Sequence, residues 1–444
     1  MLQELTSPHA LRNEIQSLLV QNGIDSDCFI QMLDYTIELF ETQGLGTDYY
    51  GYHNINHELE VTYVTMLVAN RDTINEFTID DLKYLYVAAL FHDFDPQKSV
   101  DKPHEQNVIK FISSDKKLRQ LLDDAKIDIE IIKVLIHRTT YPWRDRWRED
   151  AEIQIMECFR NSTIAKNDTI FQDHVMYLGA YLSVIDRLGG YSLGDFSKAM
   201  DMAKMNAHAL GWKPSLMVKR AVEYFEELLG NESDMSKMIL RILPKPMRKN
   251  FFDTVLSFMK LRQQEIKIQA DVAYENLKLL PTIENTKTRR NPEFIKSLHS
   301  IFRELPKPLQ FGGDDFEGSI KNMDTILTTL RLDTPDGEII GFAKGGALEE
   351  YKLRPEITDE NHGKKNTIFL EPIALKRGYW GLKGGSEMRH MFVMLAHAKK
   401  YKYMTSFALR DVVKGRVNKE NAEFVVQFDP ERWDYYRVKL EQTI

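Results

Sequence analysis

Hydrophobic positions in the first 280 residues recur at the spacing of amphipathic helices. Within Asp27–Glu41 apolar residues return every three or four positions, and Ile79–Phe91 is apolar enough to lie at the centre of a core. Similar patterns predict helices over 127–136, 173–188, 214–229 and 248 to about 279. Because few of these segments alternate strictly between apolar and polar residues, we expect no sheet here.

The pattern changes after residues 281–291, a polar segment bounded by prolines that we interpret as a linker. Residues 325–332 alternate, 333–337 predict a turn and 338–343 are apolar again, which indicates a hairpin. Further expected elements are strands at 366–375, 403–407, 423–428 and 435–440, and a helix at 386–400. We therefore predict an all-α domain over 1–280 and a mixed α/β domain over 292–444.

Composition excludes several classes of protein. The net charge of −7 provides no overall basic field for nucleic acid or anionic membranes. No apolar run reaches the roughly 18 residues that a membrane-spanning helix requires, and the N-terminus shows no signal-peptide pattern. The two cysteines, Cys28 and Cys158, lie among apolar neighbours and are expected to stay reduced. We expect a cytoplasmic protein.

Histidine and aspartate residues follow apolar helical segments at several points. His53 and His57 are four residues apart, one turn along the same helix face. His92 and Asp93 end one apolar segment and Asp186 ends another, and carboxylates placed there need a partner such as a cation. The mixed nitrogen and oxygen set of His57, His92, Asp93 and Asp186 suits divalent Zn, Mn, Fe, or Mg with water in the open positions.

Two more histidines extend this order. His104 follows the His-Asp pair, and His137 ends the helical segment 127–136. Six ligands of this kind hold two ions bridged by Asp93, whereas four hold one. Each added histidine is also compatible with a surface or core position, so one and two ions both remain open.

The order of His57, His92-Asp93 and Asp186 resembles the HD superfamily of metal-dependent phosphohydrolases. The segment Tyr-His-Asn-Ile-Asn-His-Glu-Leu-Glu-Val, residues 52–61, resembles the Tyr-His-Asn-x-x-His-x-x-Asp-Val signature of class I cyclic-nucleotide phosphodiesterases. The resemblance implies a helical bundle, a nucleotide substrate, His53 as the acid that protonates the leaving oxygen, and Asp93 as a catalytic ligand. An imidazole suits the acid role because its pKa lies near neutral pH.

The match to the phosphodiesterases ends soon after the His-Asp pair. That family continues with x-x-His-Pro-Gly, whereas residues 96–103 intervene here before His104. The glutamine that grips the purine has no counterpart that we can place, so the metal chemistry carries over better than the substrate. An HD-fold oxygenase with two irons shares the ligand order and is the alternative, although an oxygenase has no need of an acid at His53.

Arginines and aromatic residues follow His137 directly. Arg138 suits a phosphate, and Tyr141 or Trp143 can stack on a base. The alternative is a solvated loop with an aromatic anchor.

A glycine-rich segment lies between a predicted strand and a predicted helix, where backbone N–H groups can approach a pyrophosphate. Residues 292–440 resemble a GNAT-type acyltransferase, which implies binding of acetyl-coenzyme A here. The implied contacts are Arg377, Gly381, Gly384, Gly385 and Ser386, with Arg377 standing in for a basic residue that the motif lacks. The alternatives are an acyltransferase regulated by a nucleotide-sensing HD domain, a sensing or homodimerisation module, and a degenerate HD scaffold.

Overall fold

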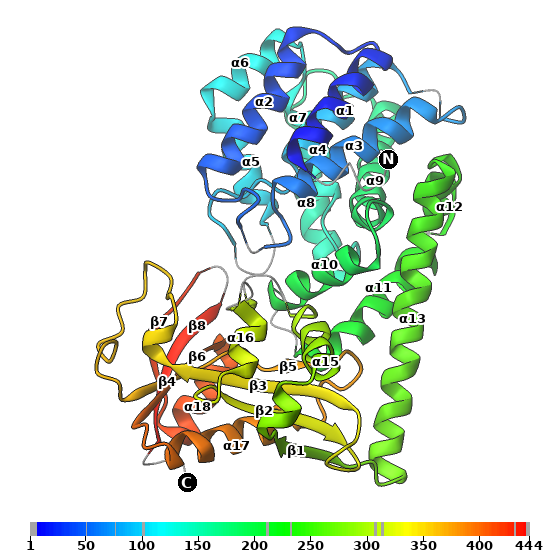
Figure 1. Cartoon of the computed structure of the whole chain (residues 1–444). Helices are drawn as coiled ribbons and strands as arrows, with labels where there is room; N and C mark the ends of the chain where they lie inside the picture. The colour runs from blue at the N-terminus through cyan, green and yellow to red at the C-terminus, as the bar shows by residue number, and fades with distance from the viewer. Residues whose placement is uncertain are drawn as a thin grey trace. The chain divides into compact units, whose positions relative to one another are not determined.

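The computed structural model describes residues 7–49, 51–75, 77–99, 103–209, 213–230, 233–305, 309–311, 315–429 and 432–440. The chain forms two compact units (Figure 1). Unit 1 consists of Met1–Trp212 and Lys219–Phe258, and unit 2 consists of Lys213–Val218 and Met259–Ile444. The described part of unit 1 is helical and that of unit 2 is mixed α/β, so the predicted fold classes are confirmed at this level.

Unit 1 consists of helices, and the long helix α13 (Lys245–Tyr274) is shared between unit 1 and unit 2. The helices of unit 1 are α1 (Pro8–Gln21), α2 (Asp27–Thr42), α3 (Ile55–Arg71), α4 (Ile79–Phe91), α5 (Glu105–Ser114), α6 (Lys116–Asp124), α7 (Ile129–Arg138), α8 (Asp145–Asn161), α9 (Thr169–Ser192), α10 (Phe196–Ala209), α11 (Met217–Gly230) and α12 (Ser233–Ile242). The 3-10 turn η2 (Pro214–Leu216) belongs to unit 2, and α13 begins in unit 1 and ends in unit 2. Across the described residues, no helix combines the length and apolar character that crossing a bilayer requires.

Helices α3, α4 and α9 pack against one another in the middle of unit 1. Helix α4 is buried along most of its length, as its nearly unbroken apolar sequence predicts, and a capping box between Thr78 and Asp81 fixes its start. Helix α3 starts at Asn54, whose side chain accepts the N–H groups of Asn56 and His57. Helices α3 and α4 are therefore fixed at their N-terminal ends by capping side chains and along their faces by packing.

Unit 2 is built on one sheet with helices on both faces (Figure 1). The strands follow the order β1-β2-β3-β4-β6-β8-β7, and β5 pairs with β3. The strand bounds are β1 (Leu279–Ile283), β2 (Ile326–Leu332), β3 (Ile339–Ala347), β4 (Thr367–Leu370), β5 (Ala374–Leu375), β6 (Tyr403–Leu409), β7 (Glu423–Val426) and β8 (Trp433–Lys439). Neighbouring strands are antiparallel except for β4 and β6, which are parallel.

Two apolar layers cover this sheet. Helices α17 (Gly384–Ala398) and α18 (Arg410–Glu420) contribute to one, together with Ile268 from the end of α13. Helices α15 (Pro292–Phe302) and α16 (Phe316–Lys321) contribute to the other. The short α14 (Thr286–Arg289) and the 3-10 turn η5 (Leu348–Glu350) complete the unit.

The segment predicted as a linker, residues 281–291, is folded instead. Its first residues belong to β1, which pairs with β2, and α14 follows. The expected domain boundary near residue 280 also differs from the observed division, which falls within α13. Arg289 of this segment is 4% exposed and donates to the carbonyl groups of Ile320, Asn322 and Thr325.

Replacing Arg289 by alanine is expected to lower the free energy of unfolding by roughly 2–4 kcal/mol, because three carbonyl groups lose a charged donor. Urea denaturation of the full chain, followed by fluorescence, measures this loss. The neighbouring Arg290 is exposed, so Arg290→Ala is the matched control and should change stability by less than about 0.5 kcal/mol. Equal denaturation midpoints for the two variants would show that the hydrogen bonds of Arg289 do not stabilise the fold.

Candidate metal centre

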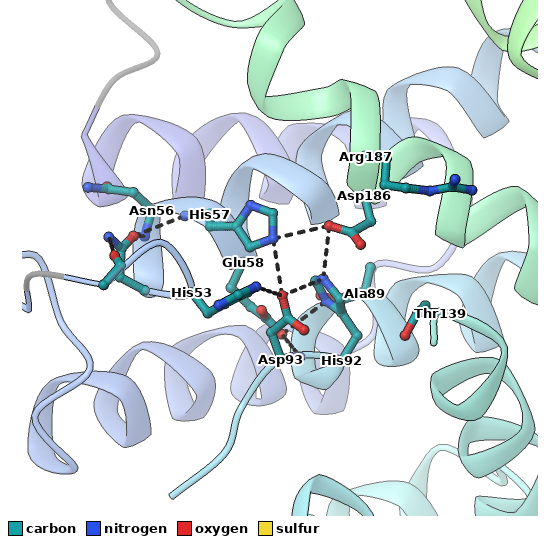
Figure 2. A network of polar contacts seen from close by, with 12 residues as sticks. His53, Asn56, His57, Glu58, Ala89, His92, Asp93, Thr139, Asp186 and Arg187 are labelled. Carbon is teal, nitrogen blue, oxygen red and sulfur yellow. Dashed lines mark hydrogen bonds and ion pairs between the residues drawn. The ribbon is translucent and has the colours of Figure 1, made fainter. Parts of the chain in front are cut away.

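Three central helices bring four side chains together from distant parts of the chain (Figure 2). His57 lies in the first turn of α3, His92 is the C-cap of α4, Asp93 follows it, and Asp186 lies within α9. One ligand atom from each residue lies within 4.8 Å of the others. The prediction that these four residues meet is therefore confirmed.

The contacts within the cluster run between imidazole nitrogens and carboxylate oxygens. His57 Nε2 lies 3.1 Å from both Asp93 Oδ2 and Asp186 Oδ1. His92 Nε2 lies 3.3 Å from Asp93 Oδ2 and 3.6 Å from Asp186 Oδ1. Figure 2 shows all four groups pointing towards one another, while Arg187, the neighbour of Asp186, points away.

The hydrogen-bonding state of His92 tests whether a cation fits. His92 Nδ1 lies 3.0 Å from the carbonyl oxygen of Ala89, which can only accept, so Nδ1 carries the hydrogen. In the neutral ring Nε2 then presents a lone pair towards two carboxylates. This buried nitrogen has no hydrogen-bond partner among the described residues. A cation between the lone pair and the carboxylates would bind to both and so provide the partner that Nε2 lacks.

The pKa shifts of the cluster residues also indicate that a cation fits there. Burial lowers the pKa of His57, but hydrogen bonds to Asp186 and Asp93 outweigh it and raise the pKa to about 9. Burial raises the pKa of Asp186, yet the hydrogen bond from His57 and the nearby imidazole of His92 bring it well below its usual range. The cluster therefore demands positive charge at its centre, which a proton on His57 or a metal ion satisfies.

His53 lies beside the cluster. Its Nε2 is 3.8 Å from Asp93 Oδ2, on the segment that leads into α3. Burial lowers the pKa of His53 to about 4, although Asp93 opposes this change. The imidazole is therefore neutral at pH 7 in the protein alone. It is close enough to share a small ligand with the metal residues.

His104 and His137 are outside the group of four ligands that the described residues form. His104 is exposed and caps α5, and its backbone N–H donates to Asp95. His137 is buried at the end of α7, where burial lowers its pKa to about 4. A second ion held by these histidines remains a prediction.

Two acidic residues near the site were missed by the sequence analysis. Asp95 is 2% exposed and accepts hydrogen bonds from Gln97, Ser99, His104 and Asn107, so it organises the chain between the His-Asp pair and α5. Glu58 is fully buried next to His57. The available signal for Glu58 was a charged residue in a helix whose other positions suit a core.

The predicted substrate residues after His137 are engaged by neighbours in unit 1. The guanidinium of Arg138 lies 4.0 Å from the ring centre of Trp143. The hydroxyl of Tyr141 donates to Glu227 at 2.8 Å, and the guanidinium of Arg187 lies 5.2 Å from its ring centre. Base stacking and phosphate binding by these residues remain predictions.

The glycine-rich loop of unit 2 differs in detail from its prediction. Helix α17 begins at Gly384, so the N–H groups of Gly384 and Gly385 lie where a helix offers no internal acceptor. The N–H of Ser386, by contrast, already donates to the carbonyl of Lys383. The backbone N–H of Arg377 donates to Glu304, and its guanidinium lies 3.5 Å from the same carboxylate.

Gly381 adopts a left-handed backbone (φ 85°), which favours glycine, and it packs closely on Ser215 of η2. A side chain at this position would collide with Ser215, because an added Cβ would lie 2.5 Å from the Cβ of that residue. The segment containing Ser215 therefore covers this part of the loop.

Comparison with known proteins gives few matches. The sequence matches no known family profile and no curated protein. Among solved structures, a GNAT-family acetyltransferase from Staphylococcus aureus Mu50 is 14% identical and covers 37% of this chain and 99% of its own, with a TM-score of 0.24. A GNAT-family protein from Desulfovibrio desulfuricans is 15% identical over the same shares, with a TM-score of 0.22. Such low TM-scores carry no argument about fold or activity.

Proposed function

We propose that unit 1 is a metal-dependent phosphohydrolase that cleaves a phosphoester bond of a cyclic or linear nucleotide. The observation that carries the proposal is the cluster of His57, His92, Asp93 and Asp186, with the imidazole of His53 next to it. A divalent ion held there would lower the pKa of a bound water and neutralise charge on phosphate oxygens. Phosphoester hydrolysis needs both effects together with a proton donor.

The side chains around the cluster divide these tasks. His57, His92, Asp93 and Asp186 would hold the ion, and burial of the two imidazoles excludes competing water from them. His53 lies on the Asp93 side, where it can give a proton to the leaving oxygen. Its low pKa means that it needs a nearby anion to become protonated, and the phosphate of the substrate supplies that charge.

Removing the metal tests this function directly. The purified chain is stripped with EDTA and then assayed against cyclic and linear nucleotides after addition of Mn, Mg, Zn or Fe. Hydrolysis is expected to fall by more than about 100-fold without metal and to return with one of the four ions. Activity that requires iron and consumes oxygen would contradict hydrolysis and favour the oxygenase alternative.

A second candidate function for unit 2 rests on the parallel strands β4 and β6. Their ladder ends at the pair Leu370 and Ser406, while β6 continues to Leu409. The chain after Leu370 turns away and pairs with β3 as β5. The segment after β5 leads into the start of α17, where the N–H groups of Gly384 and Gly385 can bind the pyrophosphate of an extended ligand. We propose that acetyl-coenzyme A binds there.

Gly385→Glu is expected to weaken binding of acetyl-coenzyme A by at least tenfold, because a carboxylate at the helix start repels the pyrophosphate. An added Cβ at Gly385 meets only Leu375, at 3.6 Å, so the fold tolerates the change. Isothermal titration measures the affinity. Gly415→Glu on α18, where a Cβ meets nothing within 4 Å, is the control. Equal affinities for both variants would contradict binding at this loop.

A further inference from the structure

Glu58 is a buried carboxylate that forms no ion pair with a lysine or arginine in the described part of the chain. It is 0% exposed and lies on α3 beside the ligand His57. Its Oε1 is 3.3 Å from His92 Nδ1 and accepts the backbone N–H of Asp93 at 3.4 Å. Its Oε2 has no hydrogen-bond partner among the described residues. Burying a carboxylate in this way is costly, so its position requires an explanation.

A comparison with Glu60, two residues further along α3, shows that the position of Glu58 is unusual. Glu60 is equally buried but forms an ion pair with Lys198. Glu58 instead contacts the ring of one metal ligand and the backbone of another. Among the described residues its carboxylate therefore faces the metal residues and not a lysine or arginine.

The contact to His92 determines how that ring can act. With Nδ1 held by Glu58 and by the carbonyl of Ala89, the hydrogen stays on Nδ1 and the lone pair on Nε2 faces the cluster. A carboxylate on the outer nitrogen also makes the inner nitrogen a stronger donor. The N–H contact from Asp93 holds the backbone of the second ligand in the same arrangement.

We propose that Glu58 is a positioning residue of the metal site, which fixes the tautomer and orientation of His92 and strengthens its bond to the ion. The proposal rests on the metal site of the proposed function and is independent of the substrate. Glu58 acts through His92 and Asp93, and it touches neither ion nor substrate. Removing it should change the affinity and the ligand field of the bound ion.

Cobalt titration of the metal-free full chain tests this role, because Co²⁺ reports its coordination through visible absorption. Glu58→Ala is expected to bind Co²⁺ about 10–100-fold more weakly, with shifted absorption bands. Glu58→Gln keeps an accepting oxygen without the charge and should recover part of the loss. If Glu58→Ala does not fold, Glu58→Gln tests the proposal by itself. Its Co²⁺ affinity is then expected to be several-fold below that of the unmodified chain.

Asp72→Asn is the matched control for a merely structural effect. Asp72 caps the far end of α3, about 20 Å along the helix from Glu58, and accepts hydrogen bonds from Ile74, Asn75 and Tyr181. The control should lower the melting temperature but keep the Co²⁺ affinity within about twofold. Three outcomes would overturn the proposal. Glu58→Ala could bind Co²⁺ with the affinity and spectrum of the unmodified chain, Glu58→Ala and Asp72→Asn could lose Co²⁺ affinity equally, or the unmodified chain could bind no Co²⁺.

Failure of the positioning role and failure of the proposed function are distinguishable. If Co²⁺ binding depends on Glu58 but no phosphoester is cleaved with any metal, the positioning role stands and the hydrolase proposal fails. If cleavage depends on metal but Glu58→Ala binds Co²⁺ normally, the hydrolase proposal stands and the positioning role fails.

Discussion

Alanine in place of Asp93 is expected to abolish hydrolysis of the nucleotide substrate, with a loss of more than about 100-fold. Asp93 Oδ2 contacts both ligand imidazoles, so its removal takes away the carboxylate that joins them. Even a residue outside the ligand set is worth about 10–100-fold in metal affinity or activity, so a ligand should be worth more. The metal content of the purified variant should fall together with its activity.

The outcome for Asp93 is informative because the carboxylate is held at a desolvation cost, so its loss should leave the chain folded. Circular dichroism checks the fold, and elemental analysis gives the metal content. Asp123→Ala, an exposed aspartate on α6, is the control and should keep full activity. Full activity in the Asp93 variant would end the assignment of this cluster as the active site.

Alanine in place of His53 is expected to slow hydrolysis by roughly 10²–10⁴-fold while the metal content stays unchanged. His53 lies 3.8 Å from Asp93 but is not one of the four grouped ligands. A substrate with a p-nitrophenolate leaving group needs little protonation, so the loss with that substrate should be much smaller. The difference in loss between the two kinds of substrate distinguishes a general acid from a metal ligand.

Equal losses with both kinds of leaving group would contradict the role of His53 as an acid. A fall in metal content would instead place His53 among the ligands. His9→Ala, an exposed histidine on α1, is the control for loss of an imidazole elsewhere and should behave like the unmodified chain.

Apolar spacing predicted helices α2, α4, α7, α9 and α11 of unit 1 because each buries one face or its whole surface. The bounds predicted for Ile79–Phe91 agree with α4, where the apolar run and the capping box coincide. The linker prediction for residues 281–291 was wrong because an edge strand tolerates the proline and the polar residues that suggested a loop. Pro281 lies in β1, which pairs with β2 at the edge of the sheet that the described residues form, so its missing N–H costs little.

The strand predicted over 366–375 is interrupted between Leu370 and Ala374. Pro372 lies in the gap and has no N–H to donate to a ladder, so the interruption had a visible cause in the sequence. His92, Asp93 and Asp186 could be predicted because they follow apolar runs, and His57 because it lies four residues after His53. Glu58 could not, since only the folded chain shows that its carboxylate reaches His92.

The path of the chain between the two units restricts how they can be separated. Residues 213–218 belong to unit 2, although the segments on either side belong to unit 1, and α13 later returns the chain to unit 2. Neither unit is therefore one continuous stretch of sequence. A fragment truncated near residue 258 or 280 retains η2 without the sheet to which it belongs. Studies of either half in isolation are better made by inactivating point variants than by shortening the gene.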